Sequence, residues 1–374
     1  MSSVDRILIT GGAGFIGSHL ADALLARGYK VRVLDSLDTQ VHGEASQFPA
    51  YLARDVEALH GDVRNPRDIV RALDGVHAVF HFAAAVGVGQ SMYEIERYTD
   101  INNRGTAVLL EALLRNPVQK LIVASSMSVY GEGLYRTSSG RTCSPAPRSL
   151  ASLKSGRWDP VDEHGQALVP LPTPEDKPPA PESIYALSKY DQERMCLMFG
   201  RAYSVPAVAL RFFNVYGERQ ALSNPYTGVL AIFASRYLNG KPPIIFEDGQ
   251  QKRDFVHVRD LAAGCVLALE TSIARDAVFN LGSGRAYSVL EVAEQLGRVL
   301  GRTDLAPRVC GDYRAGDIRN CFADITRARA VLGYEPRVDL ESGLTELAGW
   351  LAGTPCEDRT EAAAHELRQR GLVA

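Results

Sequence analysis

The chain lacks the features of several protein classes. Its six cysteines are scattered without a Cys-x-x-Cys pair, so we expect neither a disulfide framework nor a metal site, and the thiols fit a reducing cytoplasm. No stretch approaches the roughly 18 consecutive apolar residues of a membrane span. No basic, apolar leader stands before the first expected strand, so we expect a cytoplasmic protein with no membrane partner.

An excess of charge of either sign is also absent. The 374 residues include 41 Lys plus Arg and 44 Asp plus Glu, which gives a formal net charge of −3. A general nucleic-acid binder would carry a net basic field, so we expect no nucleic-acid partner. The length, with 46% hydrophobic residues, provides for one large domain or two moderate ones with a buried core.

Apolar strands alternate with helical stretches up to residue 130. Continuous Val, Ile and Leu strands between helices predict a parallel sheet that is covered on both faces. Right-handed crossovers then give an α/β fold of the doubly wound Rossmann type. The expected strands are 6–10, 30–35, 57–62, 77–83, 120–126 and 207–214, and the expected helices are 15–27, 66–73, 101–115 and 183–203.

A glycine-rich loop follows the first expected strand and opens a helix. Gly11, Gly14 and Gly17 have the spacing Gly-x-x-Gly-x-x-Gly, and Phe15 and Ile16 start the helix. Glycines allow a tight turn and a close approach of a pyrophosphate to backbone N–H groups, and the helix N-terminus adds a favourable dipole. This context predicts a dinucleotide-binding loop; a plain glycine turn is the alternative.

The second expected strand ends at Asp35, 18 residues after Gly17. A carboxylate there can accept hydrogen bonds from a ribose hydroxyl and repels a 2′-phosphate. Residues 36–42 contain no Arg or Lys, so we expect the cofactor to be NAD rather than NADP. The alternative is that Asp35 is a surface residue without a ligand.

Two more strand ends are expected to face the cofactor. Asp62 and Val63 follow the third strand, where the carboxylate would face the adenine amino group or, alternatively, lie near the N-terminus of the next helix. Phe82, Ala83 and Ala84 end the fourth strand, where small residues let the backbone pass close to the cofactor. All five residues are therefore predicted to line the cofactor site.

Tyr185 and Lys189 form a Tyr-x-x-x-Lys pattern, whose spacing places both side chains on one helix face. A free tyrosine, with a pKa of about 10, is a poor base near neutral pH. A lysine one turn away and a nicotinamide cation nearby favour the phenolate, and the lysine can also hold the cofactor ribose. The alternative is an exposed helix pair. Tyr237 and Lys241 match the pattern too, but a glycine inside it and two prolines after it indicate a decoy.

Three serines, Ser125, Ser126 and Ser128, stand at the end of the fifth expected strand. One of these hydroxyls can hydrogen-bond a substrate hydroxyl and orient it between Tyr185 and the cofactor. Alternatively, the serines only satisfy backbone groups at the strand end.

We expect three parts: an NAD-binding Rossmann domain at 1–214, a smaller mixed α/β substrate lobe at 215–353, and an exposed polar helix in the tail at 354–374. The chain is expected to cross between the lobes. The first part contains an irregular insertion, 132–181, rich in Pro, Ser, Gly and Arg, and such a long irregular run is uncommon in a compact domain. It is either a lid or flap anchored by Trp158 or a tolerated surface excursion.

Together, these motifs resemble the extended short-chain dehydrogenase/reductase superfamily over residues 5–350, apart from the insertion. Within it, the chain is similar to nucleotide-sugar 4-epimerases of the UDP-glucose 4-epimerase type, and most to the group of dTDP-L-rhamnose 4-epimerases. Further matching segments are Asn102-x-x-Gly105-Thr106, 212–217, 253–260, 280–284 and Arg314-x-Gly316-Asp317 for the superfamily, and 200–203, 222–228 and 247–249 for the group.

The resemblance implies a role for each candidate residue. Ser126 aligns with the catalytic hydroxyl, Tyr185 with the base and Lys189 with its partner. Guanidinium forks suit phosphate oxygens, so two arginines are implied to clamp a substrate diphosphate, unless they form ion pairs with Asp248 or Asp312. The other implied roles are cofactor contacts for Asn102, Asp62 and Ser125, substrate contacts for Ser128 and Asn214, the clamp for Arg253 and Arg314, and a ribose contact for Asp317.

The implied function is an NAD-dependent nucleotide-sugar C4 epimerase that acts through a transient 4-keto sugar, with dTDP-L-rhamnose as the expected substrate. Met127 and Ser128 stand where 4,6-dehydratases of the superfamily carry an Asp-Glu pair, so dehydration is disfavoured. The alternatives are UDP-glucose or UDP-N-acetylglucosamine 4-epimerisation, a reductase, dehydrogenase or decarboxylase on a nucleotide sugar, and a non-catalytic dinucleotide sensor. The expected partners are a dTDP- or UDP-linked sugar and a second copy of the chain, paired through helices 101–115 and 183–203.

Overall fold

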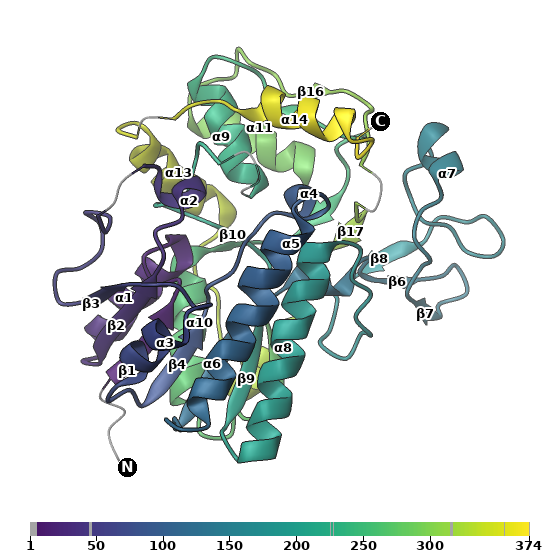
Figure 1. Cartoon of the computed structure of the whole chain (residues 1–374). Coiled ribbons are helices and arrows are strands. Elements are labelled where there is room, and N and C mark those ends of the chain that lie inside the picture. The colour runs from purple at the N-terminus through teal and green to yellow at the C-terminus, as the bar shows by residue number, and fades with distance from the viewer. Residues whose placement is uncertain are drawn as a thin grey trace.

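A seven-stranded parallel sheet forms the centre of the molecule, in the order β14-β9-β5-β4-β1-β2-β3 (Figure 1). The computed structural model describes residues 6–44, 47–224, 226, 228–314, 317–354 and 356–373. The strands are β1 (Arg6–Thr10), β2 (Lys30–Asp35), β3 (Glu57–His60), β4 (Ala78–His81), β5 (Lys120–Ser126), β9 (Ala207–Phe212) and β14 (Ala277–Leu281). The predicted doubly wound α/β fold is confirmed.

Helices cover both faces of this sheet. On one face, α1 (Phe15–Ala26) and α10 (Val258–Glu270) pack against each other and share an apolar cluster with the strands. On the other face, α3 (Pro66–Leu73), α6 (Gly105–Leu113) and α8 (Ile184–Tyr203) bury a second cluster. The inner strands β1, β4, β5 and β9 therefore bury side chains on both sides, which explains their largely apolar sequences, whereas the edge strand β3 is mostly exposed.

Two predicted elements differ in their course, and the expected strands 57–62 and 77–83 are shorter, at 57–60 and 78–81. The helix expected at 101–115 begins earlier, because α5 (Ile95–Tyr98) continues through a π-helical turn (Thr99–Arg104) into α6. The strand expected at 207–214 is interrupted after β9, because the backbone N–H of Asn214 donates to Asp254 O (3.0 Å) and pairs with a different strand. The second difference separates β9, in the central sheet, from Asn214, which pairs with Phe255 in another sheet.

A second lobe follows β9 and has an apolar cluster of its own, built on α9 (Val229–Leu238), α11 (Val289–Val299) and α13 (Leu340–Leu351). Helix α11 begins with a capping box, in which Ser288 and Glu291 each accept from the other's backbone N–H. The domain bounds stay a prediction, but β14 and α10 return to the first lobe, so the chain does cross between the lobes. The remaining elements of this half are β10 (Asn214–Tyr216), β11 (Ile244–Ile245), β12 (Lys252–Arg253), β13 (Phe255–His257), β15 (Tyr287–Ser288), β16 (Arg308–Val309), β17 (Asn320–Cys321) and α12 (Thr326–Leu332).

The segment expected to be irregular, 132–181, contains a small antiparallel sheet that extends from the side of the molecule (Figure 1). Its strands have only two or three residues each, too few to show a period in the sequence. They are β6 (Leu134–Arg136), β7 (Thr142–Cys143) and β8 (Val169–Leu171), with the helix α7 (Leu150–Lys154) between the last two.

The tail forms the helix α14 (Thr360–Gln369), which lies on the second lobe beside α9, where Glu361 pairs with Arg236 (3.2 Å; Figure 1). The sequence predicts an exposed helix, but Ala363 and Leu367, four residues apart, are both buried. One face of the tail helix therefore packs onto the molecule. Within the described ranges, no helix combines the length and apolarity that crossing a bilayer requires.

We predict that Gly17→Ala lowers the free energy of unfolding by about 1–3 kcal/mol, as overpacking does elsewhere. A Cβ at Gly17 would lie 2.7 Å from the Cα of Gly12 and closer still to the carbonyl oxygen of Gly11, both backbone atoms. The matched control is Gly349→Ala inside α13, where a Cβ meets nothing within 4 Å and the helix should gain up to about 1 kcal/mol. Urea denaturation measures both, and equal stability of Gly17→Ala and the wild type would contradict the close packing.

Candidate active site

A cleft of about 830 Å³ opens at the carboxyl ends of the central strands and extends into the second lobe. This edge is where ligands bind in open α/β sheets. Asn102 alone among the predicted site residues is absent from the lining. The predicted residues that do line the cleft are Gly11, Gly14, Phe15, Ile16, Gly17, Asp35, Asp62, Val63, Phe82, Ala83, Ala84, Ser125, Ser126, Ser128, Tyr185, Lys189, Asn214, Arg253, Arg314 and Asp317.

The glycine loop can hold a diphosphate. Gly11 has a positive φ of 71°, and a Cβ there would lie 2.9 Å from the backbone nitrogen of Ala83, so only glycine fits between the two strand ends. Gly14 precedes α1 and offers no side-chain cap. The N-terminus of α1 therefore faces the cleft with its backbone N–H groups uncapped by a side chain, as phosphate binding requires.

Asp35 is fixed at the edge of the cleft by backbone donors. Its carboxylate accepts hydrogen bonds from the N–H of Ala13 (3.0 Å) and from the N–H of Leu37 (2.9 Å). These bonds hold the oxygens near the glycine loop, where a ribose hydroxyl would approach. The contact with ribose stays a prediction.

Asp62 forms an ion pair that the sequence analysis did not predict. Arg64 donates to both of its oxygens, and the same guanidinium donates to Asp100 (2.7 Å). The hydrogen bonds from Arg64 lower the pKa of the Asp62 carboxyl. The group is therefore ionised at neutral pH, and its predicted contact with adenine would have to share oxygens with Arg64.

The predicted base and hydroxyl meet in the cleft. Ser183 caps α8 by accepting from the N–H of Ala186 (3.1 Å), which places Tyr185 in the first turn. Ser126 ends β5 and accepts from the hydroxyl of Ser128 (2.8 Å). Burial raises the pKa of Tyr185, whereas the neighbouring hydroxyl of Ser126 acts in the opposite direction.

Lys189 lies one turn after Tyr185 and is almost fully buried. Its ammonium donates to the side-chain oxygen of Gln192 (2.7 Å), and burial lowers its pKa to about 7. In the chain alone, burial outweighs any effect of Lys189 on the pKa of Tyr185, and the combined effect of the lysine and the nicotinamide stays a prediction. Loss of hydration dominates at both groups, so it raises the pKa of the phenol and lowers that of the ammonium.

A chain of buried polar groups continues from Lys189 under the glycine loop. Gln192 donates to the hydroxyl of Thr106 (2.9 Å), and His81 bridges Thr106 (2.9 Å) and Thr10 (2.8 Å). Burial lowers the pKa of His81 to about 3, so its ring is neutral. Thr10 ends β1, directly before Gly11, so these bonds connect the lysine to the strand that carries the loop.

Asn102 lies in the π-helical turn and is fully buried outside the cleft. Its side chain accepts from the N–H of Ala85 (2.7 Å) and donates to the Ala85 carbonyl (3.1 Å) and to Ser188 (2.9 Å). It therefore fixes the segment after β4 to α8, and it supports the cofactor site without touching the cleft.

A buried ion pair behind the serines escaped the sequence analysis. Glu193 on α8 binds Arg211 on β9 through two hydrogen bonds (2.7 and 3.0 Å) and accepts another from the hydroxyl of Ser125 (2.7 Å). The hydroxyl of Ser125 is thus engaged with Glu193. The sequence did offer one indication of a buried ion pair, an arginine inside the apolar strand 207–212.

The substrate side of the cleft carries polar groups that lack partners. Among the described residues, nothing hydrogen-bonds the buried Oδ1 of Asn214 or the Nε of Arg314. Arg314 stacks on the ring of Phe246, with its guanidinium carbon 4.7 Å from the ring centre. Gly316, part of the matched motif, lies outside the described residues. Unpartnered polar atoms at a cleft wall fit a polar ligand.

Arg253 is held in place by carbonyl groups of the neighbouring strand. It donates to the carbonyls of Ile318 (2.6 Å) and Arg319 (2.9 Å), and its guanidinium lies 3.5 Å from Asp317. The alternative ion pairs of Arg253 and Arg314 do not form, because the two candidate acids have other arginine partners. These are Arg319 for Asp248 (2.6 Å) and Arg368 for Asp312 (2.7 Å).

The tail helix adds a wall that sequence reasoning missed. Glu361, Leu367 and Arg368 of α14 line the cleft. Glu366 on the same helix accepts hydrogen bonds from Tyr93 (3.2 Å) and Tyr226 (3.0 Å). The four-residue spacing of Ala363 and Leu367 in the sequence could have indicated that one face of this helix is packed.

The fold and site together define an enzyme of the Rossmann type with a dinucleotide cleft and a Ser, Tyr and Lys group at its centre. The model of the NAD dependent epimerase/dehydratase family matches residues 7–150 and 163–282. The chain belongs to this family, and its cofactor is NAD.

Three known proteins illustrate the similarity. The dTDP-L-rhamnose 4-epimerase of Burkholderia thailandensis is 34% identical over 93% of this chain and 95% of its own. The structure of UDP-glucose 4-epimerase from Thermotoga maritima with UDP-glucose has a TM-score of 0.75 and 32% identity, and covers 93% of this chain and 98% of that one. The UDP-glucuronic acid 4-epimerase from Bacillus cereus, with UDP-glucuronic acid and NAD, has a TM-score of 0.74 and 29% identity, and covers 93% and 99%.

We predict that Lys189 makes stability rise with pH above neutrality. The folded protein releases this proton near pH 7, whereas a lysine in the unfolded chain keeps it until about pH 10.4. Unfolding therefore takes up a proton between these values, and the free energy of unfolding increases with pH. Urea denaturation at about pH 7.5 and about pH 9.5 should show a smaller increase for Lys189→Met than for the wild type or the exposed control Lys154→Met. Equal increases in all three proteins would contradict the burial of a lysine at this site.

Proposed function

We propose that the protein is a nucleotide-sugar C4 epimerase that interconverts dTDP-L-rhamnose and dTDP-6-deoxy-L-talose. The single observation that supports the C4 chemistry is that Ser126, Tyr185 and Lys189 line the same cleft, which joins the glycine loop to the second lobe. The similarity to the Burkholderia enzyme supports the choice of sugar and base.

In this proposal, the side chains of the cleft move one proton and hold one oxygen. Tyr185 removes the proton from the C4 hydroxyl and later returns it, and Ser126 hydrogen-bonds the same oxygen in both directions. Bound NAD supplies the hydride acceptor for C4, the hydride donor that restores C4, and a positive charge that favours the phenolate. Lys189 would hold the nicotinamide ribose.

Inversion at C4 requires the 4-keto sugar to present its other face. Arg253 and Arg314 grip the diphosphate while the sugar turns about it, because guanidinium groups bind phosphate oxygens in a fixed geometry. Asn214 contributes its unpartnered amide oxygen at the same wall. The sugar itself needs room and few fixed contacts.

Two other functions use the same residues. UDP-glucose or UDP-N-acetylglucosamine 4-epimerisation differs only in the base and sugar, and a reductase or decarboxylase of nucleotide sugars differs in its net reaction. Dehydration is disfavoured, because Met127 is buried and Ser128 donates to Ser126. Neither side chain can act as an acid–base pair near neutral pH.

The test of function is an incubation of purified protein with a panel of dTDP- and UDP-sugars without added cofactor. We expect inversion at C4 of dTDP-L-rhamnose by NMR, with no lasting change in NADH absorbance, because the hydride returns to the same carbon. If only UDP-sugars are inverted at C4, the substrate is a UDP-sugar and the proposed dTDP-L-rhamnose is wrong. Net accumulation of NADH, or release of CO₂ from a uronic acid, would replace the proposed reaction.

We predict that Tyr185→Phe lowers kcat by about 10²–10⁴-fold, the typical contribution of a general acid–base group. NAD binding should change little, since the ring and its packing remain. The matched control is Tyr237→Phe in the decoy motif, whose hydroxyl donates to the carbonyl of Ala293 (3.0 Å), and it should keep the wild-type rate. Full activity of Tyr185→Phe would refute the assigned base.

We also propose a homodimer paired through the helical run from α5 to α6 and through α8. Leu187 and Met198 of α8 are 44% and 50% exposed, and their spacing of eleven residues places them on one helix face. Two such helices from each copy would bury these side chains in a four-helix contact.

The prediction is a dimer mass by light scattering at micromolar concentration, and a monomer mass for Met198→Glu because a charge would enter the contact. The control is Ile273→Glu, at an exposed position outside the three helices, which should stay dimeric. A monomeric wild type would contradict the proposal.

A further inference from the structure

The insertion 132–181 is fastened to the second lobe by one of its own arginines. The side chain of Arg148 is only 5% exposed, although it lies between the short elements β7 and α7. Its guanidinium pairs with Glu247 (2.8 Å) and donates to the carbonyl oxygens of Asp317 (2.8 Å) and Trp158 (3.2 Å). One side chain thus joins the insertion to two segments of the second lobe.

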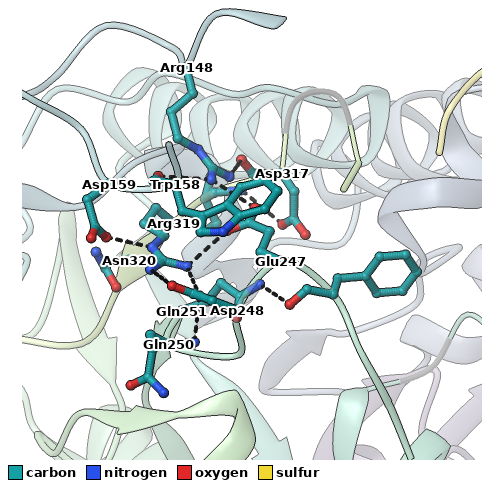
Figure 2. Close-up of polar contacts among 12 residues, drawn as sticks. Arg148, Trp158, Asp159, Glu247, Asp248, Gln250, Gln251, Asp317, Arg319 and Asn320 are labelled. Carbon is teal, nitrogen blue, oxygen red and sulfur yellow. Dashed lines mark hydrogen bonds and ion pairs between the residues drawn. The ribbon is translucent and has the colours of Figure 1, made fainter. Parts of the chain in front are cut away.

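A second arginine, Arg319, completes the junction from the other side. It donates to Asp159 of the insertion (2.7 Å), to Glu247 (3.0 Å) and to Asp248 (2.6 Å), as Figure 2 shows. Glu247 is buried between Arg148 and Arg319 and has a positive φ of 53°, a conformation that residues other than glycine disfavour. Such a conformation persists where the surroundings hold it, and here the two arginines do so.

This junction lies directly behind the substrate wall of the cleft. Asp317, whose carbonyl Arg148 holds, lines the cleft and faces Arg253 at 3.5 Å. Glu247 adjoins Phe246, the ring on which Arg314 stacks. Arg253 and Arg314, the two arginines assigned to the diphosphate, therefore each contact a segment that Arg148 fixes.

We propose that Arg148 is a positioning residue for the nucleoside diphosphate end of the substrate. It holds the turn at 246–248 and the backbone of Asp317 in register, so the insertion braces the diphosphate site from behind. The insertion is then a support for binding, in contrast to a lid over the sugar or a passive surface loop. This inference rests on the proposed function, because it takes a nucleoside diphosphate as the ligand of this wall.

The test uses UDP and dTDP as probes, measured by calorimetry on the full chain with its NAD. In Arg148→Ala the dissociation constant for the preferred probe should rise about tenfold or more, because a buried fork of hydrogen bonds is lost. NAD content should be unchanged. With the sugar nucleotide that the protein turns over, KM should rise in parallel while kcat stays within about twofold, since uniform binding is lost and the reacting groups are not.

Two further variants separate positioning from general stability. Arg148→Lys keeps the charge beside Glu247 but loses the fork, so its affinity should lie between those of the wild type and Arg148→Ala. The control is Arg141→Ala, which removes an exposed ion pair with Glu163 in the same insertion and should bind as the wild type does. If Arg148→Ala fails to fold, the inference is tested by comparing the probe affinity of Arg148→Lys with that of Arg141→Ala.

Unchanged probe affinity in the Arg148 variants would overturn the inference, as would a fall in kcat at constant KM or an equal loss in Arg141→Ala. These results would leave the proposed function in place. Absence of probe binding to the wild type would instead overturn the proposed function, and this inference with it.

Discussion

The buried ion pair between Glu193 and Arg211 is the interaction on which the geometry of the site depends. Glu193 belongs to α8, Arg211 to β9, and Ser125, which donates to Glu193, to β5. Helix α8 also carries Tyr185, strand β5 also carries Ser126, and β9 ends two residues before Asn214. Removing one partner of a buried pair leaves an uncompensated charge and costs about 3–5 kcal/mol. The pair thus fixes the distance between the phenol and the serine more firmly than apolar packing alone could.

Burial sets the electrostatics of the same site. It raises the pKa of Tyr185 and lowers that of Lys189 to about 7, so the chain alone favours a neutral phenol beside a lysine that has partly lost its charge. The positive charge of oxidised nicotinamide favours the phenolate in such a low-dielectric setting. Proton transfer is thereby coupled to a filled cofactor site, and the apolar surroundings that suppress the base also strengthen the interaction that activates it.

The sequence predicts the central sheet well, because β1, β2 and β5 are buried on both faces and their apolar runs end at turn residues. It also places Tyr185 and Ser126 together, since the carboxyl ends of parallel strands and the first turn of α8 meet at one edge. It misses what depends on contacts between distant segments. Arg148 and Asp317 are 169 residues apart in the chain, and no local pattern connects them. The low pKa of Lys189 could likewise not be predicted from the sequence, because it depends on how completely the fold excludes water.

Hydride removal from C4 and its return to C4 are the centre of the account. The most direct measurement follows a sugar nucleotide deuterated at C4, turned over in ordinary water and analysed by NMR. The account predicts that the epimerised product keeps its deuterium at C4, because the hydride never exchanges with solvent. Loss of the deuterium to water would show that C4 is inverted by proton exchange, and would contradict the account.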